Sequence, residues 1–172
     1  MSDFFSMSQD ECWQMLKKFD FGTFITPDFN VSHLPYVVND NKELYFHIAK
    51  KNPLINGIPD NRCLFTILGP HGLVETDHYI VKPAVPTWNY LSIKLTGYCH
   101  LIDEDKKKSV MLETLKRFQP SLMDDKSTLP DKVFSNLLSS ITVFKFKIET
   151  IDGIAKLSQN RSCIEQEISL II

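Results

Sequence analysis

The chain has 172 residues, the size of one ordinary domain, so we expect a single domain spanning residues 1–172. Its residues are 43% hydrophobic and 23% charged, which predicts a packed core and excludes a disordered chain. The formal net charge of −2 excludes a globally basic surface for nucleic acid, while a local basic patch stays open.

The first part of the chain predicts one helix followed by three strands. The helix is expected over residues 8–19, where Ser8 and Glu11 have the spacing of a capping box and apolar residues share one face. Strands are expected where β-branched and aromatic residues alternate with turn-forming residues, over 21–26, 32–38 and 43–48. In the third strand, Phe46 and its apolar neighbours face one side, and His47 faces the other.

The middle of the chain predicts longer strands and irregular connections. Residues 50–57 favour a short helical or irregular connection, and 62–68 form an apolar run typical of a strand buried on both faces. A turn is expected at Gly69–Gly72, followed by extended chain and then a loop containing two prolines. The longest strand is expected over 90–102, with a bulge or sharp coil at Gly97.

The last part of the chain predicts two helices, a strand and a terminal segment. Asp103 is expected to cap a helix over 103–118, and Pro130 lies in the first turn of a second helix over 129–140. A strand over 142–148 and a terminal helix or tail over 158–170 follow. Six or seven strands in meander order, with helices inserted late, predict a mainly β protein built on a closed antiparallel barrel.

Cysteine spacing and apolar run length bear on the compartment. The cysteines are widely separated and have no zinc-type spacing, which favours reduced, buried thiols: Cys12, Cys63, Cys99 and Cys163. The polar and acidic start does not have the composition of a signal peptide. No apolar run approaches the roughly 18 residues that cross a bilayer, so we expect a cytoplasmic protein without a membrane span.

Catalytic signatures are missing from the sequence, which contains no nucleophile elbow, Walker loop, dinucleotide fingerprint or zincin motif. Whether the protein is an enzyme therefore stays open. The histidines are scattered, and most are expected to be hydrogen-bonded structural residues: His33, His47, His71, His78 and His100. His71 and His78 have no obvious third ligand, so no metal site is expected.

Three segments are richer in polar and aromatic residues than a plain barrel requires. Residues 47–53 end a strand with two lysines and an asparagine, which suits a phosphate or simply a solvated turn. Residues 85–90 combine Trp, Asn and Tyr, which suits the wall of a planar ligand or an aromatic core cluster. Residues 155–161 place Lys and Arg around Ser, Gln and Asn, which suits an anion, a flavin rim or a capped helix start.

These segments resemble a known family over nearly the whole chain. The more specific motifs are Val85–Tyr90 (VPTWNY) and Lys156–Arg161 (KLSQNR), in this order and at this separation. Weaker motifs agree in order along the chain: Phe21–Thr23, Ser32–Pro35, His47–Leu54 and Gly69–Gly72. On these residues the sequence resembles the FMN-binding negative transcriptional regulator family, the Pai-type protease synthase and sporulation regulators.

The resemblance implies an antiparallel split β-barrel similar to pyridoxamine-phosphate-oxidase-like flavoproteins, with FMN bound between the subunits of a homodimer. It implies that Lys50, Lys51 and Asn52 grip the phosphate. His33, Pro35 and His47 would line the flavin ring. The remaining contacts would come from later segments, through Thr87, Trp88, Asn89, Lys156, Gln159 and Arg161.

One stretch departs from the family pattern, which has an aromatic, proline-containing segment ending in Trp-Tyr after the Gly69–Gly72 motif. This chain keeps Tyr79 but has His78 in place of the tryptophan, and it adds Glu75 and Asp77. Two carboxylates beside an anion site weaken FMN binding, so a dimer with a vestigial pocket stays open.

The function implied by the resemblance is a flavin-binding negative regulator of transcription or a redox module. A flavin-dependent reductase or oxidase and a haem-binding split barrel are the alternatives. The sequence has no helix-turn-helix and no basic stripe, so direct binding to DNA is not expected.

Overall fold

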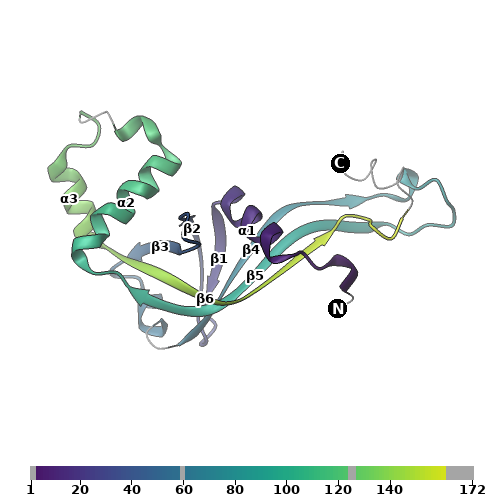
Figure 1. Cartoon of the computed structure of the whole chain (residues 1–172), viewed down its shortest axis with the longest axis horizontal. Helices are drawn as coiled ribbons and strands as arrows, with labels where there is room; N and C mark the ends of the chain where they lie inside the picture. Colours follow the sequence, from purple (N-terminus) through teal and green to yellow (C-terminus); the bar gives the residue numbers. More distant parts are fainter. Residues whose placement is uncertain (1–2, 59–60, 124–126, 162–172) are drawn as a thin grey trace. The chain divides into compact units, whose positions relative to one another are not determined.

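The strands form a closed barrel. The computed structural model describes residues 3–58, 61–123 and 127–161. Within them lie six strands: β1 (Phe21–Ile25), β2 (Val31–Val38), β3 (Leu44–Ala49), β4 (Arg62–Val74), β5 (Thr87–Leu101) and β6 (Ile141–Lys156). They follow one another around the barrel in the order β1-β2-β3-β6-β5-β4 (Figure 1). The antiparallel barrel with helical additions is thus confirmed, but β3 pairs with β6, so a simple meander was the wrong order.

Helices flank the strands at three points of the chain: α1 (Gln9–Lys18), α2 (Glu104–Phe118) and α3 (Asp131–Ser140). The shorter 3-10 helices are η1 (Asp3–Phe5), η2 (Pro53–Gly57), η3 (Thr76–His78) and η4 (Pro120–Met123). The capping box is confirmed, because the Ser8 amide donates to the Glu11 carboxylate at 2.7 Å and the Glu11 amide donates to Ser8 Oγ at 3.3 Å. Among the described helices, none is long and apolar enough to cross a membrane.

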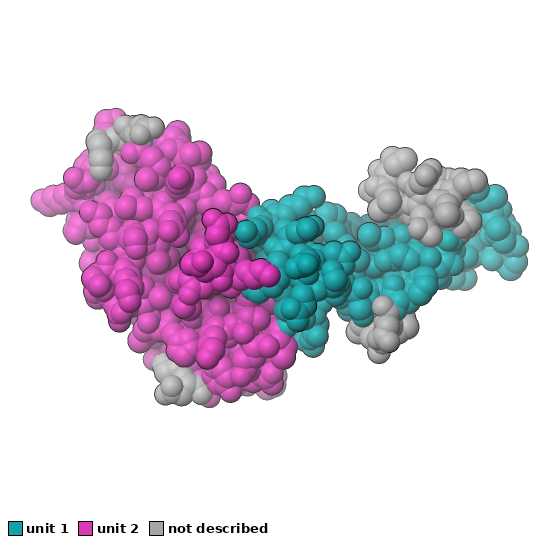
Figure 2. All heavy atoms as spheres, viewed as in Figure 1, with its two compact units in different colours: residues 1–19, 66–94, 151–172 teal, residues 20–65, 95–150 magenta. Residues whose placement is uncertain are grey.

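The chain divides into two compact units, shown in different colours in Figure 2. Unit 1 comprises residues 1–19, 66–94 and 151–172, and unit 2 comprises residues 20–65 and 95–150. Strands β4, β5 and β6 each contribute residues to both units. The prediction of a single domain stays a prediction, and the units are described separately below.

Unit 2 has an aromatic core inside the barrel. Phe46 of β3 lies 4.9 Å from Phe24 of β1 and 5.5 Å from Phe144 of β6, measured between ring centroids. Phe46 is almost fully buried, as are its neighbours Leu44 and Ile48, which confirms the expected alternation of β3. A second apolar cluster lies where α2 and α3 pack on the start of β6, around Met111, Phe134 and Val143.

Unit 1 is built from α1 packed on strands. Cys12 and Leu16 are each 1% exposed, and the strand residues leave no space between them and the helix. A Cβ atom on Gly153 of β6 would lie 2.4 Å from the Cys12 sulfur, and one on Gly69 of β4 would lie 2.9 Å from the Met15 Cε atom. Glycine at these positions therefore allows the helix to approach the strands.

Several expected boundaries were wrong. Gly69–Gly72 is not a turn, because β4 continues through it to Val74, and the chain after Val74 forms η3 instead of extended structure. Alternate β4 residues are buried, so the run over 62–68 is not buried on both faces. Turn propensity acts locally, whereas pairing along a long ladder comes from the tertiary fold.

Other details differ at the ends of elements. Asp103 takes the N-cap position of α2, but its side chain accepts no capping hydrogen bond from the helix backbone. Its carboxylate pairs with Lys106 Nζ at 3.2 Å. Pro130 takes the N-cap position of α3. β5 stays continuous at Gly97, where a Cβ atom would lie 2.0 Å from the carbonyl oxygen of Lys147 in β6. Cys163 and most of the expected terminal segment over 158–170 lie outside the described residues.

Candidate functional site

A polar cluster in unit 1 brings together residues from two of the predicted segments. We call it the β5–β6 cluster. It joins the start of β5 to the chain that follows β6, and it contains Tyr79, Thr87, Asn89, Lys156, Ser158, Gln159 and Arg161. Lys156 Nζ donates to Thr87 Oγ1 at 3.0 Å. This bond holds a half-buried ammonium group against the strand instead of leaving it in solvent.

Asn89 and Ser158 connect the two segments through buried hydrogen bonds. The Asn89 amide nitrogen donates to Ser158 Oγ at 3.0 Å, and Ser158 Oγ lies 3.2 Å from Asn89 Oδ1. Their exposed fractions are 6% and 3%. Ser158 has a φ of 62°, in the left-handed region that L-residues other than Asn, Asp and Gly rarely adopt. The hydrogen bonds therefore fix a tight change of chain direction after β6.

The turn that begins at Ser158 places the other two polar side chains. The Arg161 amide donates to the Ser158 carbonyl at 2.9 Å, which closes the turn. Gln159 Oε1 accepts from the Leu157 amide at 2.7 Å, and its amide nitrogen donates to the Ala155 carbonyl. The Gln159 side chain is thus engaged by the local backbone, which limits its freedom to contact a ligand.

Arg161 and Tyr79 form a cation–π pair. The guanidinium carbon lies 4.4 Å from the centre of the Tyr79 ring. The Tyr79 side chain is 3% exposed, and its hydroxyl is buried without a hydrogen-bond partner among the described residues. The same holds for Nδ1 of the neighbouring His78. These two orphaned atoms were missed as site residues, because sequence shows that a polar group is present but not that it lacks a partner.

An exposed aromatic pair lies on the strands of the same unit. Trp88 of β5 stacks on His71 of β4, with ring centroids 5.9 Å apart and planes inclined by 28°. Trp88 remains 49% exposed. The pair joins two of the predicted motifs, and its exposed face can stack on a planar ligand.

The predicted residues of β2 and the segment after β3 lie in unit 2, where local structure engages several of them. His33 Nδ1 and Thr23 Oγ1 are 3.0 Å apart, and half-buried Pro35 pairs with Phe21 across the sheet. Asn52 Oδ1 accepts from the amide of Leu54 at 3.0 Å and so caps η2. The side chains of Lys50 and Lys51 are exposed.

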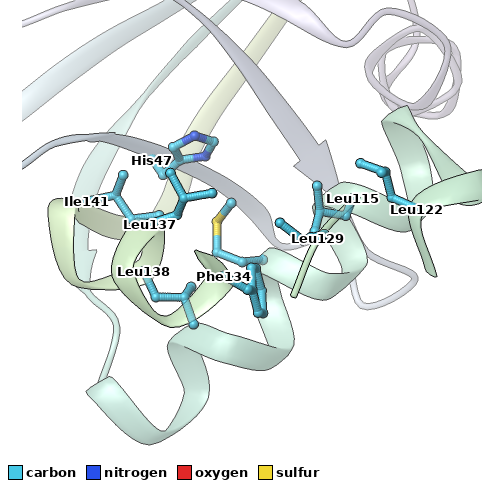
Figure 3. A pocket seen from close by; sticks show the side chains of 9 residues that line it. His47, Leu115, Leu122, Leu129, Phe134, Leu137, Leu138 and Ile141 are labelled. Atoms are coloured by element: carbon cyan, nitrogen blue, oxygen red, sulfur yellow. The ribbon is translucent and has the colours of Figure 1, made fainter. Parts of the chain in front are cut away.

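His47 faces away from the barrel core, as its alternation with Phe46 predicts. It is half-buried, and burial lowers the pKa of its imidazole. The ring lines an apolar cavity formed with α2 and α3 (Figure 3). Its predicted place beside a flavin ring stays a prediction.

The acidic residues of the divergent stretch lie at the surface. Glu75 and Asp77 are both exposed; Glu75 precedes η3 and Asp77 lies within it, shortly before buried Tyr79. Among the described residues, no group of three or more His, Cys, Asp and Glu side chains is arranged to hold a metal ion.

Comparison with known proteins identifies relatives of this chain. Residues 1–150 match the model of the family described as "Putative FMN-binding domain". The protease synthase and sporulation protein PAI 2 of Bacillus subtilis (strain 168) is 30% identical over 167 residues, covering 89% of this chain and 78% of the relative.

Solved structures share the fold at low sequence identity. The flavocytochrome Anf3 of Azotobacter vinelandii is 16% identical with a TM-score of 0.71, covering 88% of this chain and 69% of that chain. The FAD and heme binding protein of Mycobacterium smegmatis is 15% identical with a TM-score of 0.69, covering 93% of this chain and 77% of that chain.

Proposed function

We propose that this chain, which belongs to the FMN-binding domain family matched over residues 1–150, binds FMN through the β5–β6 cluster. FMN has an anionic phosphate, a polar chain and a planar ring with hydrogen-bonding edges. The cluster supplies the matching chemistry with two cationic side chains, Lys156 and Arg161. Trp88 adds an exposed aromatic face in the same unit. The donor set therefore fits the group.

The observation that carries the proposal is the buried Tyr79 hydroxyl, for which the described part of the chain offers no hydrogen-bond partner. A buried polar atom without a partner costs about 1–3 kcal/mol, and native structures leave few of them. Here the Tyr79 hydroxyl and His78 Nδ1 are both orphaned, next to a ring that already holds the Arg161 guanidinium. A ligand that accepts or donates a hydrogen bond at this point recovers that cost.

The residues of the cluster would hold and orient the ligand. Lys156 and Arg161 would supply positive charge for its anionic part, and the hydrogen bonds of Asn89 to Ser158 would fix the turn from which Arg161 extends. When bound, FMN supplies one- and two-electron transfer, which the chain's own side chains cannot supply. We propose a redox or regulatory module, with a flavin reductase or oxidase as the alternative.

We propose that the protein is a homodimer and that a second copy covers apolar side chains of unit 1. Four large aliphatic residues of this unit are 60–70% exposed: Leu68, Ile80, Val81 and Val85. Three of them, Ile80, Val81 and Val85, lie in the segment between η3 and β5, close in sequence to Tyr79 and Thr87. Large aliphatic side chains that form a contiguous exposed patch are typical of an interface, and a second copy would remove these side chains from water. A second copy placed there would enclose a ligand bound at the cluster.

Regulation of transcription by this chain is also a proposal, supported by the relationship to the Bacillus sporulation protein. The net charge of −2 favours an indirect role over binding to DNA. A cytoplasmic location agrees with reduced cysteines, three of which are free and buried in the described residues.

The first experiment is an absorbance spectrum of the purified chain before and after addition of FMN, with size exclusion on the same sample. We expect a flavin spectrum on a dimer. A Soret band after addition of haem, without flavin binding, would instead support the haem alternative. A colourless protein that binds neither FMN nor haem would contradict the proposal and favour a vestigial pocket.

Substitutions locate the site. Lys156→Met and Arg161→Met are each expected to weaken FMN binding at least tenfold, measured by quenching of flavin fluorescence. Lys94→Met is the matched control, because Lys94 lies in the same unit and its ammonium pairs with Asp152 at 3.0 Å on the surface. Lys51→Met tests the phosphate grip implied by the family. If Lys51→Met were the only variant that lost FMN binding, the phosphate would be assigned to the segment after β3 and not to the β5–β6 cluster.

A further inference from the structure

Unit 2 contains a cavity that the proposed flavin site does not use. It has a volume of about 280 Å³ and lies where α2 and α3 cover β3 and the start of β6. Figure 3 shows the His47 ring and Ile141 at one end of the view, and Leu115 and Leu122 at the other. The cavity is partly open to solvent, since Leu137 in its wall is 52% exposed, and an apolar cavity of about 150 Å³ holds a benzene molecule. The space is therefore large enough for a small organic ligand.

The chemistry of the wall is apolar except at one point. Leucine, isoleucine, methionine and phenylalanine side chains line the cavity together with His47, and none of the lining side chains among the described residues is charged. The described residues provide no hydrogen-bond partner for the His47 side chain, and burial lowers the pKa of its imidazole, which favours the neutral form. A neutral imidazole offers one donor and one acceptor, so the wall presents one polar anchor on an apolar surface.

The kinds of apolar side chain narrow the ligand class. Met111 of α2 and Phe134 of α3 are each 8% exposed, and both line the cavity. A thioether sulfur and an aromatic ring both make favourable contacts with an aromatic partner. Water gains little in such a space, because it needs two or more polar partners and the wall supplies one. A charged ligand would lose its hydration without an opposite charge to compensate.

We propose that the α2–α3 cavity is a binding site for a neutral aromatic small molecule that carries one hydrogen-bonding group, with His47 as its polar anchor. The site lies wholly within unit 2 and is separate from the residues of the β5–β6 cluster. Its occupant would brace α2 and α3 against β3. The proposal does not depend on FMN binding, and the two are tested separately.

Indole and indene test the proposal, because the two molecules have the same shape and differ at one N–H group. We expect both to bind saturably to the full chain, with indole at least fivefold tighter, measured by calorimetry. The resonance of a labelled Met111 methyl group should shift with the same affinity. His47→Leu should still bind both molecules but lose the preference for indole. No saturable binding of either molecule, or an unshifted Met111 methyl resonance, would overturn the proposal.

A cavity-filling variant and a competition experiment complete the test. Leu138→Trp should abolish binding of both molecules, while Val133→Trp, a change at an exposed position of the same helix, should leave it intact. If Leu138→Trp fails to fold by circular dichroism, the result for His47→Leu and the Met111 resonance decides. Saturating FMN should not displace indole, and displacement would show that the cavity belongs to the flavin site instead.

Discussion

Ser158 allows a quantitative test of how the β5–β6 cluster is held together. Two costs meet at this residue: its backbone is in the left-handed region at a φ of 62°, and its hydroxyl is buried against the Asn89 amide. Ser158→Ala removes the hydroxyl and keeps the strained backbone. Ser158→Gly removes the hydroxyl and also relieves the strain, because glycine adopts positive φ readily. The pair of variants therefore separates the two contributions.

The expected magnitudes follow from these two costs. Loss of the hydroxyl leaves the buried Asn89 amide short of a partner, which lowers the free energy of unfolding of Ser158→Ala by about 1–3 kcal/mol. A left-handed backbone conformation costs an L-residue about 1–2 kcal/mol, and glycine avoids this cost. Glycine loses about 0.5–1 kcal/mol of stability in turn, because its unfolded chain has greater conformational freedom. Ser158→Gly should therefore be more stable than Ser158→Ala by about 1 kcal/mol.

Urea unfolding followed by circular dichroism measures these differences, and an unchanged slope with denaturant shows that the unfolded state is comparable. The double variant Asn89→Ala/Ser158→Ala removes both partners, so its loss should be smaller than the sum of the two single losses. Flavin fluorescence should show weaker FMN binding in Ser158→Ala than in Ser158→Gly, because Arg161 extends from the same turn. Equal stability of the alanine and glycine variants, or additive losses in the double variant, would refute the reasoning.

Three further predictions follow from other contacts. Gly97→Ala should destabilise the barrel by about 3 kcal/mol or more, measured by urea unfolding, because the new Cβ atom would lie 2.0 Å from a carbonyl oxygen of β6. Hydrogen bonds from the side chains of Lys145, Asn39 and Tyr45 lower the pKa of the Glu43 carboxyl to about 2. The stability that the Glu43 carboxylate contributes is therefore present above pH 4.5 and is lost as the pH falls towards 2. Glu43→Gln should reduce that acid-induced loss by about 1 kcal/mol, a value discounted for the partial exposure of the pair. Glu75→Gln/Asp77→Asn should tighten FMN binding about threefold in low salt, since two negative charges near Tyr79 are removed.

Two of these changes have a control in the same chain. Gly72→Ala should be nearly neutral, because nothing lies within 4 Å of the position of its Cβ atom. Glu113→Gln changes an exposed charge of α2 in unit 2, so it should not tighten FMN binding. A loss of stability in Gly72→Ala equal to that in Gly97→Ala, or unchanged acid sensitivity in Glu43→Gln, would contradict these predictions.

The strands of the barrel could be predicted from sequence where burial alternates, but their ends could not. In β3 the pattern of Leu44, Phe46 and Ile48 correctly identifies the core face, because each side chain reports its own burial. The extension of β4 through Gly69–Gly72 is not visible, since glycine and proline favour turns locally and the ladder that overrides them comes from another part of the chain.

In the candidate site too, the sequence shows which residue types are present but not which of them contact one another. The motifs around Asn89 and Lys156 mark polar residues, yet only the structure shows that Asn89 bonds Ser158, 69 residues along the chain. His47 illustrates the opposite case. Alternation predicts the face of β3 on which it lies, but the helices that cover this face come from a segment more than 50 residues later.

The two proposed sites depart from ordinary packing in opposite ways, which makes them separable. In unit 1, the Tyr79 hydroxyl is a buried polar atom that no described residue pairs with, so a polar and charged ligand recovers the missing interaction. In unit 2, the space beside His47 is a partly open apolar cavity, so a neutral aromatic ligand that fills it gains contacts with the wall. The charged phosphate of FMN would lose its hydration in the apolar cavity, which therefore excludes it. Indole is uncharged, so it forms no ion pair with Lys156 or Arg161. Each ligand should therefore stabilise the protein against unfolding in the presence of the other, with effects that add.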